Sequence, residues 1–326
     1  PEVLKRARDY LQARGYAVAG GIATVPGEDF GVRQRGPLAW YSWFDWTAPE
    51  TQADLRRVMA EAGPLFARFI VDDFLATANE SPAAQRAKGS RDWGAYRRDL
   101  MAELAGPLFV HPVRVQRPDA ILILKYPQWY DRFHRFGYDP ARLSPQFDEV
   151  WVGVESRGMR TPRYGFVPAY QGFVNYTWLS TIAGPPVRGA WFDHGDCDAR
   201  DFVDQAYISV LAGAQEIMIF NYGSMAAHPG PAAFGAHRPR LEALHAAIAP
   251  DRAWRVHAYK PAVSDPGADM YLYDYLGMLG VPLRPTARFP KETQALLLAT
   301  HAAADPALWR KTQALRARNP ETRIVL

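Results

Sequence analysis

Short runs of apolar residues alternate along the chain with segments in which apolar residues recur with a helical period. The runs are typical of buried strands, and the other segments are typical of amphipathic helices. Strands are expected at 16–24, 68–74, 120–127, 147–155, 189–193 and 216–221. Helices are expected at 2–14, 49–62, 93–104, 170–182, 199–212 and 239–248. Alternation of this kind predicts repeated βα units and a mostly parallel sheet.

These units predict a TIM barrel, in which eight parallel strands close into a ring. The six expected strands leave the ring incomplete, and the chain opens on a helix, so the first strand is expected before Pro1. Beyond residue 252, a strand at 254–261 is either the last strand of the barrel or the first strand of a second domain. Strands at 281–283, 294–298 and 322–326 follow it and alternate with helices at 268–279 and 306–318. This spacing predicts a small doubly wound α/β domain, incomplete in this chain. We therefore expect a catalytic barrel at 1–252 and a smaller domain at 253–326.

Composition excludes several classes of protein. The formal charge is +4 over 326 residues, but the basic residues are scattered, which argues against a nucleic-acid partner. Cys197 is the single cysteine, so no disulfide can form within the chain. No membrane span or signal peptide is predicted. Because the chain begins and ends inside secondary structure, we expect a fragment, secreted or periplasmic if a signal precedes it and cytoplasmic otherwise.

Three of the predicted strands end in acidic residues. Asp72 and Asp73 end the second strand, Glu155 ends the fourth and Asp193 ends the fifth. The carboxyl ends of barrel strands meet at one face, so these acids are expected to gather in one pocket. Hydrolysis of a glycosidic bond needs one protonated carboxyl group and one ionised carboxyl group. The pattern therefore predicts a glycoside hydrolase.

Asp73 and Glu155 are the predicted catalytic pair, with Glu155 as the acid and Asp193 as the substitute for either. Adjacent strand residues point to opposite faces, so only one of Asp72 and Asp73 is expected to face the site. Two carboxyl groups roughly 5 to 10 Å apart across an aromatic-lined pocket would fit this mechanism. For any single acid, a helix N-cap or a buried ion pair is an equally good explanation.

Several motifs resemble a group of uncharacterised bacterial proteins classed as glycoside hydrolases. They are Asp72-Asp73-Phe74, Lys125-Tyr126-Pro127-Gln128-Trp129-Tyr130, Gly137-Tyr138, Phe147-Asp148, Gly153 to Arg157, Gly189 to Asp193 and Asp274 to Gly280. The resemblance implies a TIM barrel followed by a glutamine-amidotransferase-like domain, similar to the module that family-42 beta-galactosidases use for trimerisation. Members of the group often have Cys after the Asp-Asp-Phe motif, where this chain has Ala78-Asn79-Glu80, so that thiol is missing here.

Lys125 ends the apolar strand at 120–127, and Arg157 lies two residues after Glu155. A buried Lys125 needs an anion, so it either pairs with an acid of the site, binds a substrate oxygen or props up the barrel rim. Arg157 either neutralises a neighbouring acid or binds an acidic sugar. Asp72, Tyr126 and Asp196 complete the predicted polar contacts to substrate.

Aromatic side chains are the second carbohydrate signature, because sugar rings stack on them. Trp43 and Trp191 are predicted to contact substrate, and the cluster from Trp40 to Trp46 is expected to form one wall of the cleft. Core packing is the alternative for each of these rings.

Two other functions stay open. A metal-dependent hydrolase would use the segment from Asp193 to Asp198, with His194 and Asp196 among the ligands. Its spacing matches no standard metal motif, and Asp residues that cap the next helix explain it as well. A non-catalytic carbohydrate-binding barrel is the other alternative. No nucleophile elbow, Walker loop or dinucleotide fingerprint is present, so no cofactor is expected, and the expected partner is a carbohydrate, with a homo-oligomer left open.

Overall fold

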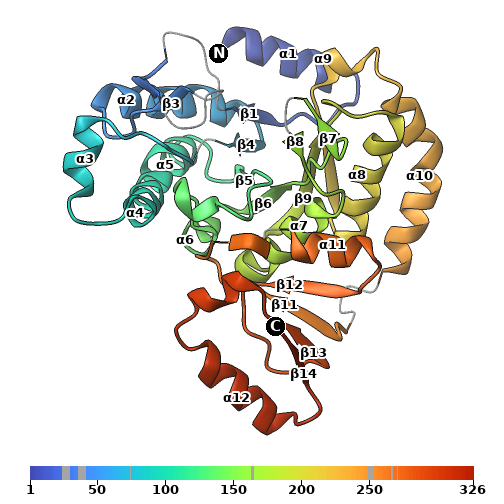
Figure 1. The fold of residues 1–326 in the computed structure, drawn as a ribbon. Coiled ribbons are helices and arrows are strands. Elements are labelled where there is room, and N and C mark those ends of the chain that lie inside the picture. Colours follow the sequence, from blue (N-terminus) through green and yellow to red (C-terminus); the bar gives the residue numbers. More distant parts are fainter. Residues whose placement is uncertain are drawn as a thin grey trace. The chain divides into compact units, whose positions relative to one another are not determined.

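The computed structural model describes residues 1–23, 30–35, 42–73, 75–162, 165–248, 253–265, 267–269 and 271–326. The largest sheet has six strands in the order β1-β4-β5-β6-β9-β10 (Figure 1). They are β1 (Gly20–Ile22), β4 (Arg68–Asp72), β5 (Ile121–Tyr126), β6 (Glu149–Gly153), β9 (Val187–Asp193) and β10 (Glu216–Phe220). The β1–β4, β4–β5 and β9–β10 pairs are parallel. The predicted parallel α/β fold of the barrel type is confirmed, with a strand at each of the predicted places.

The chain forms two compact units. The first contains Pro1–Tyr126 with Arg132–Val150, and the second contains Pro127–Asp131 with Trp151–Leu326. The first unit carries α1 (Glu2–Gln12), α2 (Pro49–Ala62), α3 (Pro82–Lys88), α4 (Trp93–Ala105), α5 (His111–Arg114), α6 (Pro140–Leu143) and the antiparallel pair β2 (Arg33–Arg35) and β3 (Ser42–Phe44). Nearly all of β5 is buried, which explains why its apolar run is continuous rather than alternating.

The second unit carries β9, β10 and a separate parallel sheet. Its helices are α7 (Gln171–Ala183), α8 (Ala199–Ala212), α9 (Tyr222–Met225), α10 (Gly230–Ala247), α11 (Leu272–Met278) and α12 (Leu308–Arg318), and β7 (Arg160–Thr161) pairs with β8 (Gly165–Phe166). The separate sheet has the order β12-β11-β13-β14, from β11 (Val256–Tyr259), β12 (Leu283–Thr286), β13 (Ala295–Leu297) and β14 (Arg323–Val325). Strand order reverses beside β11, as in a doubly wound sheet. In Figure 1, α8 and α10 lie side by side.

Helix α7 packs against both β9 and β12, so nearly every side of it is buried. A helix that is apolar all round is typical of such a position. Trp178 Nε1 donates to Lys260 O at 2.8 Å, and Thr181 Oγ1 accepts from Ala287 N at 2.9 Å. These bonds tie α7 to the segments that follow β11 and β12.

Two predicted helices have different bounds in the structure. The helix expected at 239–248 begins earlier, at Gly230, and includes Pro239. The helix expected at 268–279 is the shorter α11, Leu272–Met278. Among the described residues, no helix combines the length and the apolar character that crossing a membrane requires.

Asp274 of α11 is fully buried and accepts a hydrogen bond from Tyr130 Oη to Oδ2 at 2.6 Å. This bond helps to explain why the short segment Pro127–Asp131 belongs to the second unit. Burial raises the pKa of the Asp274 carboxyl to about 7, although the Tyr130 bond opposes the rise. Between pH 3.8 and about 7, the Asp274 carboxyl is therefore protonated in the folded protein and ionised in the unfolded chain.

A pKa that is higher in the folded state makes the protonated carboxyl a source of stability at low pH. The contribution is complete below pH 3.8 and is lost as the pH rises towards about 7. Its full size is up to about 4 kcal/mol, since one pKa unit corresponds to about 1.36 kcal/mol. We expect Asp274→Asn to remove this part of the pH dependence, measured by urea unfolding from pH 4 to 8. The exposed-site control Asp119→Asn should keep the wild-type slope, and an unchanged slope in Asp274→Asn would contradict the assignment.

Candidate active site

Two acids and a lysine meet at the end of β4 in the first unit. Lys125 is 2% exposed, and β5 brings it opposite Asp72 in the parallel register. Its Nζ lies 3.2 Å from Asp72 Oδ1, 3.2 Å from Asp73 Oδ1 and 3.3 Å from Asp73 Oδ2. Of the roles predicted for Lys125, the ion pair with the strand-end acids is the one that the structure contains.

The expectation that Asp72 and Asp73 point to opposite faces is wrong. Strand β4 ends at Asp72, and Asp73 has φ 49°, in the left-handed region. Alternation of side chains holds only within a strand. The turn therefore brings both carboxylates to the same ammonium group.

Tyr126, a predicted substrate contact, is a core residue. It is fully buried, and its hydroxyl lies 3.0 Å from Ser144 Oγ. Its ring packs edge-on against Tyr138 at 5.4 Å and lies 5.8 Å from the ring of Phe133. Burial raises the pKa of the Tyr126 hydroxyl, in keeping with a site that water does not reach.

The predicted aromatic wall is in part core as well. Trp46 is 1% exposed, donates from Nε1 to Ala76 O and packs against Phe44 and Phe109. Trp40, Tyr41 and the side chain of Trp43 lie outside the described residues, so their predicted role stays a prediction.

Glu155 lies just beyond β6 in the second unit and is 4% exposed. With the Gln128 amide turned so that its nitrogen faces Glu155, Gln128 Nε2 donates to Glu155 Oε2 at 3.2 Å. In the same orientation, Gln128 Oε1 accepts from Arg157 Nη1 at 3.3 Å. A Cβ atom at Gly153 would lie 2.4 Å from Glu155 Oε2, so the carboxyl occupies space that only glycine leaves empty.

Arg157 and Asp193 form a buried, bidentate ion pair. Arg157 Nε donates to Asp193 Oδ1 at 2.9 Å, and Nη2 donates to Oδ2 at 2.7 Å. Gln205 of α8 contacts the backbone of both residues: its Oε1 accepts a hydrogen bond from Arg157 N, and its Nε2 donates one to Asp193 O. Of the two roles predicted for Arg157, neutralisation of a neighbouring acid is the contact observed.

The acidic turn after β9 caps a helix. Asp198 accepts from the backbone N–H groups of Arg200 and Asp201, and the reciprocal Asp201 contact completes a capping box for α8. Asp196 is exposed and has φ 51°. In the part of the chain that is described, no three His, Cys, Asp or Glu side chains are grouped so as to hold a metal ion. These contacts favour the helix-cap explanation of the segment.

Trp191, another predicted substrate contact, is 6% exposed and stacks on the ring of Phe220 at 5.3 Å. The indole of β9 therefore packs against a side chain of the neighbouring strand β10. Sequence reasoning assigned no role to Gln128, Gly153 or Gln205. Gln128 and Gly153 lie at or just beyond the ends of predicted strands, which was the available signal for them, whereas Gln205 lies within an ordinary helical pattern.

A family model for the catalytic domain of a probable glycosyl hydrolase matches residues 1–238, well over half of the chain. The chain belongs to this family. The chain is 24% identical over 308 residues to the uncharacterised protein SSO3021 of Saccharolobus solfataricus. The match covers 83% of this chain and 50% of the relative, so the chain spans about half the length of that protein.

Two solved structures share the fold of this family member. One is a GH5_18 protein from Streptomyces cattleya in complex with Manb1-4GlcNAc, with a TM-score of 0.55 and 12% identity over 99% of this chain and 84% of that chain. The other is Gan42B, a GH42 beta-galactosidase from G. stearothermophilus, with a TM-score of 0.57 and 10% identity over 91% of this chain and 59% of that chain. At these identities the likeness establishes the fold alone.

The contact between Gly153 and the Glu155 carboxyl gives a direct structural prediction. In Gly153→Ala the added methyl group should displace Glu155 Oε2 and break its bond to Gln128, because the two atoms would be only 2.4 Å apart. Because Oε2 is at the free end of a flexible side chain, the free energy of unfolding should fall by about 1 kcal/mol, the low end of the range for overpacking. A crystal structure and a urea titration of the variant measure the two effects.

Gly235→Ala is the matched control, because no atom lies within 4 Å of a Cβ at this exposed helix position. It should leave Glu155 in place and stabilise α10 slightly. A Glu155 carboxyl that keeps its position in Gly153→Ala would contradict the packing described above.

Proposed function

We propose that the chain hydrolyses glycosidic bonds of an oligosaccharide or polysaccharide with two carboxyl groups. Its membership of the glycosyl hydrolase family carries this proposal. Backbone strain supports the position of the site. Among the described residues, the non-glycine residues with positive φ are Asp73, Arg157 and Asp196. Asp73 directly follows β4, and Arg157 and Asp196 lie within three residues after Glu155 and Asp193. Strained backbone of this kind clusters at functional sites.

Glu155 is the proposed general acid. Its carboxyl is buried, and the Gln128 amide donates to Oε2 while Gly153 leaves room for it. These neighbours fix the direction of the carboxyl, as a group that must deliver a proton to one oxygen of a substrate requires.

Asp73 is the proposed ionised carboxylate, either as nucleophile or as the base that activates water. Lys125 Nζ contacts both of its oxygens, and an ammonium group at 3.2 Å favours the anion. Asp72 shares the same ammonium and is the proposed structural partner. Measurements of kcat test the proposed roles of Asp73 and Glu155.

Asp193 is a weaker choice for either role. Its two oxygens accept from the Arg157 guanidinium and one also accepts from Gly195 N, so it is better suited to hold Arg157 in place. Asp196 is exposed and stays a proposed substrate contact.

The smaller C-terminal sheet is the proposed amidotransferase-like domain, from residue 253 onward. Its parallel strands and reversed strand order fit that class.

A screen of aryl glycosides and polysaccharides tests the proposal. Wild-type protein should hydrolyse at least one substrate, and Asp73→Asn and Glu155→Gln should each lower kcat by about 10² to 10⁴, the usual contribution of acid–base catalysis. The matched controls Asp119→Asn and Glu103→Gln alter exposed acids and should keep wild-type rates.

Full activity in both Asp73→Asn and Glu155→Gln would refute this site. Carbohydrate binding by wild-type protein with no turnover of any substrate would instead favour the non-catalytic alternative.

A further inference from the structure

A hollow of about 550 Å³ lies beside the C-terminal sheet, far along the sequence from the proposed catalytic acids. The end of α7, strands β11 and β12 and the segment after β12 line it. Its ionisable residues are His257, Arg284, Arg288, Lys291 and Glu292. Glu292 is the single acid among the lining residues, so the walls carry an excess of positive charge.

Arg284 is the least compensated of these cations. It stands beside His257 in the parallel register of β11 and β12, and it is half-buried. Burial lowers the pKa of its guanidinium. Across the described residues its guanidinium makes no ion pair or hydrogen bond. Because partial burial of an unpaired charge is costly, this group is suited to an anion from outside the chain.

His257 does not supply this charge but can accept a hydrogen bond from a ligand. Thr293 Oγ1 lies 2.9 Å from His257 Nδ1. The Thr293 hydroxyl donates its own hydrogen to the backbone carbonyl oxygens of Arg255 and Ala295. Nδ1 therefore donates, and in the neutral ring Nε2 is the acceptor. Burial and the nearby Arg284 lower the pKa of His257 to about 4, which keeps the ring neutral.

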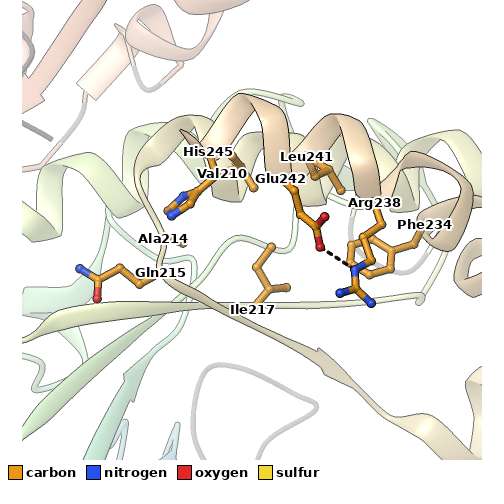
Figure 2. A pocket seen from close by; sticks show the side chains of 9 residues that line it. All are labelled: Val210, Ala214, Gln215, Ile217, Phe234, Arg238, Leu241, Glu242 and His245. Carbon is orange, nitrogen blue, oxygen red and sulfur yellow. Dashed lines mark hydrogen bonds and ion pairs between the residues drawn. The ribbon is translucent and has the colours of Figure 1, made fainter. Parts of the chain in front are cut away.

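A second hollow shows that unpaired charge is not general on this surface. Figure 2 shows it between β10 and α10, with Val210, Ile217, Phe234 and Leu241 among its apolar walls. There Arg238 Nε donates to Glu242 Oε1 at 2.7 Å, so its charge is paired within the same helix.

We propose that the hollow beside β12 binds a small anion with phosphoryl or carboxylate oxygens. Arg284 is the main contact, since its planar guanidinium can donate two parallel hydrogen bonds to such a group. Arg288 and Lys291 add attraction, and Phe289 offers an apolar wall to the carbon skeleton of the anion. Neither Glu155 nor Asp73 lines this hollow, and the proposal does not depend on hydrolysis.

Isothermal titration calorimetry at fixed ionic strength tests the site, with inorganic phosphate and glucuronate as separate probes. Wild-type protein should bind at least one of them with a stoichiometry of one. Arg284→Gln should raise Kd about tenfold or more, as expected for loss of a charge-assisted hydrogen bond. The control Arg310→Gln, at an exposed position of α12, should bind as wild type does.

Binding of phosphate alone identifies a phosphoryl site, binding of glucuronate alone identifies a carboxylate site, and binding of both supports the shared chemistry. Thermal unfolding without anion should show Arg284→Gln at least as stable as wild type, because the variant removes an unpaired charge. Should Arg284→Gln not fold, Arg288→Gln takes its place with a weaker expected loss. No binding of either probe by wild type, or unchanged binding in the variants, would overturn the proposal.

Discussion

Charged side chains at the buried ends of strands need a partner, because an ionised group removed from water is costly unless it is paired. This constraint organises the acids of this protein. Lys125 forms ion pairs with Asp72 and Asp73, and Arg157 donates hydrogen bonds to both carboxylate oxygens of Asp193. Each cation fixes the direction of the acids that it contacts. The carboxylates are therefore held in place before any substrate arrives.

The backbone is strained at two of the residues that form these ion pairs. Asp73, directly after β4, and Arg157, beyond the end of β6, both have φ near 50°, a conformation that costs a non-glycine residue about 1 to 3 kcal/mol. In each case the turn brings the side chain to its partner. Gly153 has the complementary role, because the absence of a side chain there admits the Glu155 carboxyl. Local geometry and electrostatics thus depend on the same few residues.

The fold could be predicted because buried strands and amphipathic helices leave periodic patterns that survive in a single sequence. The acids of the candidate site followed from their positions at strand ends. The residues around these acids could not be predicted in the same way, since an aromatic residue such as Tyr126 or Trp46 has the same sequence pattern whether it fills a core or lines a cleft. The left-handed turn at Asp73 also has no sequence signature, so the prediction that Asp72 and Asp73 point to opposite faces was wrong.

The central claim is that Glu155 delivers a proton to the departing oxygen. The most direct test compares kcat of Glu155→Gln on two aryl glycosides of one sugar, with a nitrophenyl and a dinitrophenyl leaving group. A dinitrophenolate departs without protonation, so the account predicts a large loss on the nitrophenyl substrate and a much smaller loss on the dinitrophenyl substrate. Equal losses on the two substrates would contradict it.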